Sequence, residues 1–218
     1  MFDENAYIQK DRLLLKGLLE TGGGTDRADM LSHTLLDTFG SLQNVLSADY
    51  EVLCAVDGMN DNCALYLKKA AAVVRRCICE EDSEKGISYQ KEKDLLLYLH
   101  HLFFGCSHER FYLLLFSGSN HLISTEQIGE GGLTSVVADL RKCMKAIVLK
   151  GPAFVVAVHN HRQPIARPSA EDIAATRKMQ RMFAQMHILF SEHYIITPNG
   201  QYAILQHLSA SEKGKGAL

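Results

Sequence analysis

Residues 153–161 read Ala153-Phe154-Val155-Val156-Ala157-Val158-His159-Asn160-His161, and residues 169–172 read Ser169-Ala170-Glu171-Asp172. The first stretch is short, apolar and rich in β-branched residues, which predicts a buried strand with both histidines at its C-terminal end. Side chains alternate between the two faces of a strand, so His159 and His161 point the same way, about 7 Å apart at the backbone. This spacing allows both imidazoles to hold one metal ion.

The segment that begins at Ser169 has helical periodicity, and Ser169 follows Pro168, so we expect a helix from 170 to about 186. Asp172 lies three residues on and projects from the same face of that helix. Together with the two histidines it would supply the three protein ligands of a catalytic zinc site, with the fourth position open. An ordinary helix start has the same two features, a capping serine and a carboxylate favoured by the helix dipole, so both interpretations stay open.

Glu109 heads a second predicted buried strand, residues 109–116. A metal-activated water needs a base for its proton, and this base is usually a carboxylate that is not itself a ligand. Glu109 fits the role if its strand pairs beside the histidine strand; otherwise it is a solvated carboxylate. Ser169 would donate to the developing oxyanion. Seven further histidines have no comparable spacing and are interpreted as surface or packing residues: His100, His101, His108, His121, His187, His193 and His207.

The composition is that of a globular protein of one large or two small domains, with 218 residues, 47% hydrophobic and 22% charged. A net charge of −2 creates no general attraction to nucleic acid or anionic membranes. No apolar run approaches the ~20 residues that span a bilayer, and the first residues lack a charged-then-apolar signal, so we expect a cytoplasmic protein without a membrane partner. The six cysteines lack the paired spacing of a disulfide framework or a cysteine-rich zinc site.

The chain is predicted to contain two domains. Residues 1–79 carry helical patterns interrupted by glycine-rich turns, which predicts a small helical domain. Residues 80–92 begin with a charged run, which favours a linker. Residues 93–208 form the second domain, and residues 209–218 are expected to be a flexible tail. Within the second domain we expect these elements in order: a helix at 92–104, strands at 109–116 and 122–129, a helix at 134–149, the histidine strand, the helix that follows it, and short strands at 188–190, 194–196 and 202–205.

Glu109, then His159-x-His161, seven residues and Ser169-x-x-Asp172 resemble the JAMM (JAB1/MPN+) metalloprotease signature. Within that group the chain is similar to the bacterial RadC family of the UPF0758 type, whose usual loop is His-Asn-His-Pro-Ser-Gly-x-x-x-Pro-Ser-x-x-Asp. The resemblance covers nearly the whole chain. Residues 12–17, 35–42 and the Gly58 turn resemble the family's N-terminal helical domain with its helix-hairpin-helix, and residues 192–196 resemble its Asp-His-Ile-Ile.

The resemblance implies an α/β/α JAB1/MPN domain, like that of cytidine deaminases, preceded by a small all-α helix-hairpin-helix-like domain. It implies that His159, His161 and Asp172 bind Zn²⁺, that Glu109 is the general acid and base, and that Ser169 stabilises the tetrahedral intermediate. The activity implied is that of a zinc metallopeptidase or isopeptidase, in which metal-activated water attacks an amide bond of a protein or peptide substrate.

Two segments depart from the family pattern. The loop Arg162–Arg167 reads Arg-Gln-Pro-Ile-Ala-Arg where the family has Pro-Ser-Gly and acidic or small residues, so the rim of the site is more basic and bulkier. The hairpin reads Gly58-Met59-Asn60 where DNA-binding hairpins have Gly-x-Gly. Asn60 can adopt the dihedral angles of glycine but adds a side chain, which disfavours close contact with a DNA backbone.

Two other functions stay open. The protein is a DNA-repair-associated protein if the same site cuts phosphodiesters or if the helical domain binds DNA as an accessory. Arg162 and Arg167 favour DNA, whereas the near-neutral charge and the altered hairpin count against it. The hairpin also has basic neighbours, although such helix faces are usually only solvated: Lys68, Lys69, Arg75 and Arg76. The other function is a non-catalytic interaction module with structural zinc, which would have no need of Glu109.

Overall fold

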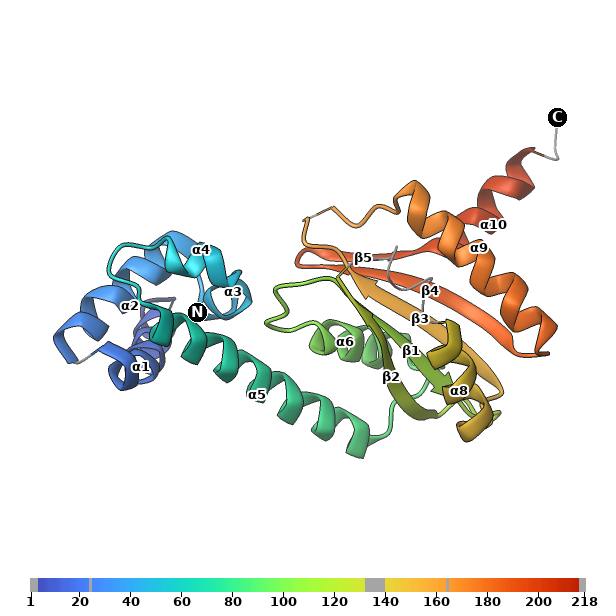
Figure 1. Ribbon diagram of the computed structural model, residues 1–218, viewed down its shortest axis with the longest axis horizontal. Coiled ribbons are helices and arrows are strands. Elements are labelled where there is room, and N and C mark those ends of the chain that lie inside the picture. Colours follow the sequence, from blue (N-terminus) through green and yellow to red (C-terminus); the bar gives the residue numbers. More distant parts are fainter. Residues whose placement is uncertain (1–3, 24, 132–139, 164, 216–218) are drawn as a thin grey trace. The chain divides into compact units, whose positions relative to one another are not determined.

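The computed structural model describes residues 4–23, 25–131, 140–163 and 165–215 (Figure 1). The chain divides into two compact units. The helical unit comprises Met1–Ile78 and Phe104–Ser107, and the α/β unit comprises Cys79–Phe103 and His108–Leu218. No helix in the described part of the chain combines the length and the apolar character needed to cross a membrane. All six cysteines are free thiols.

The helical unit is built from α1 (Glu4–Gly23), α2 (Thr25–Phe39), α3 (Leu42–Ser47), α4 (Tyr50–Cys54) and the first part of α5 (Asp61–Lys85). The predicted helical domain is present, and leucines spaced three or four residues apart lie on one side of each helix and form its core. The largest buried side chains of this core are Leu15, Leu19, Leu31, Leu35, Leu53 and Leu67.

The predicted linker is wrong over its first half, because α5 continues without a break to Lys85. The charged run contains no glycine or proline, and its side chains pair on the helix surface. Lys85 Nζ lies 2.6 Å from Glu81 Oε1, one turn away, and His101 Nδ1 lies 2.6 Å from Asp82 Oδ2. The helix ends before Gly86, whose φ of 80° lies in the left-handed region. The charged residues 80–85 therefore belong to a helix, and most of them lie on its exposed face.

Residues 104–107 lie between α6 (Glu92–Leu102) and β1 (Arg110–Phe116) in sequence, but they pack on α5 and belong to the helical unit. Lys68 Nζ donates to three backbone carbonyls, including that of Gly105 at 3.2 Å, and Arg75 donates to the carbonyl of Phe104 at 2.8 Å. A Cβ on Gly105 would lie 2.5 Å from Ala71 Cβ, so only glycine fits at this contact. Two of the basic residues near the hairpin therefore hold the fold together.

The α/β unit contains a five-stranded sheet in the order β2-β1-β3-β4-β5. The β3 and β4 strands are parallel and the other pairs are antiparallel. The α9 helix (Ala170–Gln185) connects the parallel pair. The strands are β1 (Arg110–Phe116), β2 (Leu122–Glu130), β3 (Phe154–Asn160), β4 (Leu189–Thr197) and β5 (Gly200–Ala203).

Helices cover both faces of this sheet, which confirms the predicted α/β/α architecture (Figure 1). On one face α6 (Glu92–Leu102) packs against Leu114, Val156 and Val158. On the other face α8 (Leu140–Lys150) and α9 pack against a second set that includes Val155 and Ala157. Because side chains alternate along β3, His159 belongs to the face covered by α9.

The C-terminal part differs from the prediction in three ways. The predicted strand at 202–205 ends at Ala203, because Ile204 and Leu205 begin a helix. Segments 188–190 and 194–196 do not form separate strands, because β4 runs unbroken through the polar residues between them. The expected flexible tail is helical as far as Lys215, in α10 (Ile204–Lys215). The buried Glu192 carboxylate accepts the backbone N–H of Leu205 at 2.7 Å and of Gln206 at 3.0 Å, which stabilises the start of α10. Residues 216–218 and the first part of the predicted helix at 134–149 lie outside the described residues.

Candidate metal centre

His159, His161 and Asp172 converge where β3 ends and α9 begins. His159 Nε2 lies 3.0 Å from His161 Nε2 and 3.3 Å from Asp172 Oδ1, and His161 Nε2 lies 3.2 Å from Asp172 Oδ2. His161 donates its backbone N–H to the carbonyl of Ile196 at 2.9 Å, which fixes the segment beside β4. His159 and Asp172 are buried and His161 is partly exposed, so the group is open to solvent at His161.

These side chains fit a zinc ion. Two imidazole nitrogens and a carboxylate are a donor set that catalytic zinc takes, and tetrahedral bonds of zinc place neighbouring ligand atoms about 3.3 Å apart. The three separations measured here are 3.0, 3.3 and 3.2 Å. Across the described ranges, no other three side chains of histidine, cysteine, aspartate or glutamate come together in this way.

The electrostatics keep the group in a form that can bind a cation. Burial acts to raise the pKa of Asp172, but hydrogen bonds with His159 and His161 hold that pKa well below its usual range. Burial lowers the pKa of His159, so its ring is neutral at pH 7. The hydrogen bond with Asp172 raises the pKa of the more exposed His161. The site therefore presents an ionised carboxylate beside at least one neutral imidazole.

Ser169 forms a helix cap, which is one of the two interpretations that the sequence allowed. Its Oγ accepts the backbone N–H of Asp172 at 3.1 Å, and Asp172 Oδ2 accepts the backbone N–H of Ser169 at 2.7 Å. This reciprocal pair is a capping box that positions Asp172 at the first turn of α9. Asp172 thus has both roles, since the same carboxylate also reaches the two histidines. The role of Ser169 toward an oxyanion stays a prediction.

Glu109 lies near the site because it directly precedes β1, which is the antiparallel neighbour of β3. Phe111 on β1 lies opposite His159 on β3, so the residues that precede β1 lie beside the residues that follow β3. Glu109 is partly buried, and after the larger effects of burial and Asp172 its charge also acts on the pKa of His159 and His161. The carboxylate is therefore close to the candidate ligands without being one of the three.

Asn160, between the two histidines, holds the segment that carries Glu109. Its Oδ1 accepts the backbone N–H of Arg110 at 2.7 Å, and its Nδ2 donates to the carbonyl of His108 at 3.3 Å. Asn160 is buried, so water does not compete effectively for these bonds. One side-chain amide thus fixes the backbone on both sides of Glu109.

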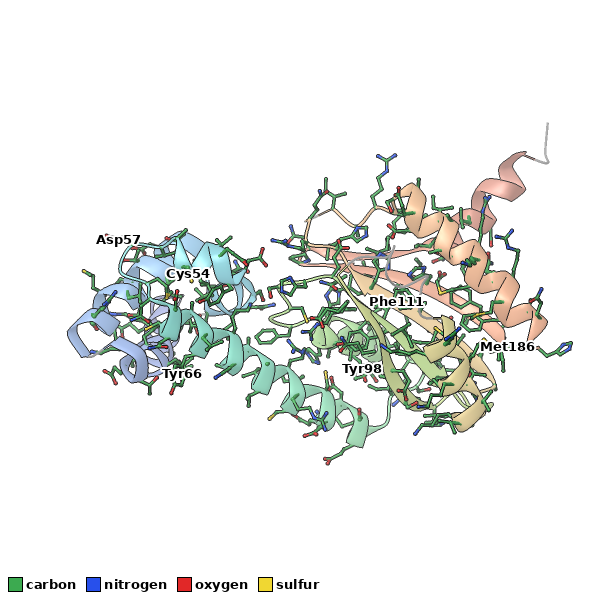
Figure 2. All side chains as sticks on the ribbon, in the orientation of Figure 1. Cys54, Asp57, Tyr66, Tyr98, Phe111 and Met186 are labelled. Carbon is green, nitrogen blue, oxygen red and sulfur yellow. The ribbon has the colours of Figure 1, made fainter. Side chains whose placement is uncertain are left out.

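His193 is the residue that sequence reasoning missed. It is completely buried on β4, and its Nε2 lies 2.8 Å from His159 Nδ1. It is therefore a packing residue and not a surface residue, and its ring contacts a candidate ligand. Burial, followed by the nearby His159, lowers its pKa well below the usual value. Phe111, which Figure 2 labels in the α/β unit, packs edge-on against this ring with 5.5 Å between centroids. The sequence feature that could have identified His193 is its position as a histidine within an otherwise apolar strand.

The loop between His161 and Ser169 borders the site. Its described residues Arg162, Gln163 and Arg167 are exposed, and the side chain of Ile165 is 71% exposed. The more basic and bulkier rim expected from the sequence therefore lies at the surface. Its effect on the choice of substrate stays a prediction.

Comparison with known proteins identifies the family. Residues 89–210 match the family described as the RadC-like JAB domain. A UPF0758 protein of Pelobacter propionicus is 31% identical over 218 residues, covering 98% of this chain and 92% of that protein. A UPF0758 protein of Janthinobacterium sp. is 27% identical over 207 residues, covering 95% and 92%. The predicted resemblance is confirmed: the chain belongs to the RadC family of UPF0758 proteins and carries its JAB-type domain.

Proposed function

We propose that this protein is a zinc-dependent hydrolase that cleaves an amide or isopeptide bond in a protein or peptide. The observation that carries the proposal is the convergence of His159, His161 and Asp172 beside a carboxylate, Glu109, that is not one of the three. A structural zinc site has all four positions filled by protein, whereas this group offers three ligands and opens to solvent at His161.

The chain's own residues divide the chemistry as follows. His159, His161 and Asp172 would hold Zn²⁺, which supplies Lewis acidity and lowers the pKa of water to about 7. Glu109 accepts the proton of the attacking water and passes it to the leaving amine. The Ser169 hydroxyl uses only its oxygen in the helix cap, so its hydrogen can be donated to the oxyanion.

A nuclease that uses the same ligands is the second candidate, and one observation favours it. Arg162 and Arg167 are exposed on the loop beside the site, where they would attract phosphates as well as acidic peptides. The helical unit offers less evidence for DNA binding, because Lys68 and Arg75 donate to backbone carbonyl groups of their own unit. The side chain of Asn60 caps α5, accepting the N–H of Cys63 at 2.8 Å.

Metal content provides the first test. Elemental analysis of the purified wild type should find about one zinc ion per chain, and His161→Ala should lower this content strongly because one of three ligands is gone. His161 is the partly exposed ligand, so its replacement disturbs packing least. A wild type that carries no stoichiometric zinc, even after incubation with the metal, would contradict the proposal.

Turnover provides the second test, with Glu109→Gln and Glu171→Gln compared on a panel of isopeptide-linked proteins, single-stranded DNA and double-stranded DNA. Loss of a general acid and base costs roughly 10²- to 10⁴-fold in rate, so Glu109→Gln should keep its zinc and lose turnover. Glu171 is an exposed carboxylate next to Asp172, and its variant should behave as wild type. If DNA is cut and Glu109→Gln abolishes that cutting, the nuclease replaces the peptidase.

A further inference from the structure

Behind the candidate metal centre, a line of buried hydrogen bonds connects β3, β4 and α9. His159 Nδ1 lies 2.8 Å from His193 Nε2, His193 Nδ1 lies 2.7 Å from Thr176 Oγ1, and Thr176 Oγ1 donates to the backbone carbonyl of Asp172 at 2.6 Å. We propose that His193 and Thr176 are positioning residues that accept and orient the Nδ1 proton of His159 when its Nε2 binds a metal. This inference rests on the proposed metal-dependent function.

The direction of each bond follows once a metal occupies His159 Nε2. The one N–H of that neutral imidazole is then on Nδ1 and donates to His193 Nε2. The single N–H of His193 is then on Nδ1 and donates to Thr176 Oγ1, whose hydrogen goes to the backbone carbonyl of Asp172. Every donor in this line therefore has an acceptor when the metal is bound.

Burial makes each of these partners necessary. Thr176 and His193 are 0% exposed and His159 is 2% exposed, so water is not available to replace a lost partner. Loss of the Thr176 hydroxyl or of the His193 ring would leave a buried N–H of the metal-bound state without an acceptor. Phe111 also restrains His159, with near-parallel rings at an angle of 16° and 6.3 Å between centroids.

Asp172 takes part at both ends of the arrangement. Its carboxylate lies 3.3 Å from His159 Nε2, and its backbone carbonyl ends the line that starts at His159 Nδ1. The helix turn between Asp172 and Thr176 therefore links the position of the Asp172 carboxylate to the Nδ1 proton of His159. Hydrogen bonds to the second nitrogen of a metal-binding histidine generally fix its tautomer and orientation, and their loss lowers metal affinity.

The first experiment measures the tautomer directly in the zinc-loaded protein. Long-range proton–nitrogen NMR spectra of ¹⁵N-labelled wild type should show His159 and His193 both protonated on Nδ1, with Nε2 of His159 bound to zinc. In Thr176→Val, which removes the hydroxyl at nearly constant volume, the N–H of His193 loses its acceptor and this pattern should change. A zinc-loaded wild type in which His193 carries its proton on Nε2, or an unchanged pattern in Thr176→Val, overturns the proposal.

The second experiment measures zinc affinity by competition with a chromophoric chelator. Thr176→Val and His193→Phe should bind Zn²⁺ about 10- to 100-fold more weakly than wild type. Thr176→Ser keeps the hydroxyl and should restore affinity, and His33→Phe, at an exposed position in the helical unit, should have no effect. Thr176→Val with wild-type affinity overturns the proposal. If the wild type itself binds no zinc, the proposed function and the inference both fail, whereas a wild type that binds zinc no more tightly than Thr176→Val overturns the inference alone.

Discussion

Asn160 lies between two candidate ligands, yet its amide serves a third residue, because its bonds to Arg110 and His108 hold the backbone around Glu109. We expect Asn160→Leu to lower the hydrolysis rate by about 10-fold or more while zinc affinity changes little, since small misplacements of a catalytic group are costly. Turnover and zinc content measured on the same preparation test this. Joint loss of zinc and activity would show instead that Asn160 supports the ligands.

The buried His193 predicts a pH dependence of stability in the metal-free protein. Its pKa is well below 6.5 in the folded state, so between the two pKa values the unfolded chain binds a proton that the folded chain does not. Stability is therefore complete above about pH 6.5 and falls as the pH decreases, by up to about 1.4 kcal/mol per pH unit for this group. Urea denaturation in EDTA from about pH 7.5 to 5 should show a smaller loss for His193→Gln. Equal slopes in both proteins would contradict the assignment.

At the site, what the sequence could predict depended on distance along the chain. His159 and His161 share a face because strand alternation is local, and Asp172 follows from the helix start at Ser169. Glu109 required the pairing of β1 with β3, which only the resemblance supported. His193 was missed because its contact with His159 depends on the parallel pairing of β3 and β4 and on the rotation of α9, and neither leaves a local pattern.

At the scale of the element, two substitutions at the start of α9 can separate the two roles of Ser169. Ser169→Ala should cost about 1 kcal/mol of stability, whereas Ser169→Gly should cost only a few tenths, because glycine is tolerated as an N-cap. Both variants lack the hydroxyl, so if it donates to the oxyanion both should lose roughly 10²- to 10³-fold in turnover. Denaturation curves and kinetics together test this. Full activity in Ser169→Gly would show that Ser169 acts only as a helix cap.

The contact between α5 and the segment before β1 depends on Gly105. Gly105→Ala adds the cost of a left-handed residue, with φ of 65°, to a clash with Ala71. Gly40 has a φ of 80° and nothing within 4 Å of an added Cβ, so Gly40→Ala carries the backbone cost alone. We expect Gly105→Ala to be the more destabilising by about 1–3 kcal/mol, the usual cost of overpacking. Hydrogen exchange of amides in α5 measures both, and equal effects would argue against the clash.

The elements themselves were predictable where hydrophobic periodicity is strong, and their ends were not. The strands β1 and β3 and the helices α2 and α6 follow their apolar patterns closely. The charged run after Glu80 and the polar residues after Ser209 have no such pattern, and both are helical. In α5 the surface pair Glu81–Lys85 continues the helix, and in α10 the Glu192 carboxylate, distant in sequence, supports its start.

For the molecule as a whole, zinc should stabilise the α/β unit. All three candidate ligands belong to that unit, and a ligand that binds only the folded state contributes about 2.7 kcal/mol at a hundredfold excess over its dissociation constant. Added Zn²⁺ should therefore slow hydrogen exchange in β3 and α9, and EDTA should reverse the effect. His161→Ala serves as the control and should respond little. Exchange in wild-type β3 that does not depend on zinc would contradict metal binding at this site.

The path of the chain through its two units has a practical consequence for work on shortened forms. The chain leaves the helical unit after Ile78, returns to it for Phe104–Ser107, and leaves again two residues before Glu109. A fragment cut at the family boundary, residue 89, would keep that returning segment but lose Lys68, Ala71 and Arg75, against which it packs. Truncation would therefore remove the anchor beside the candidate general base, and an inactive fragment would say little about the intact protein.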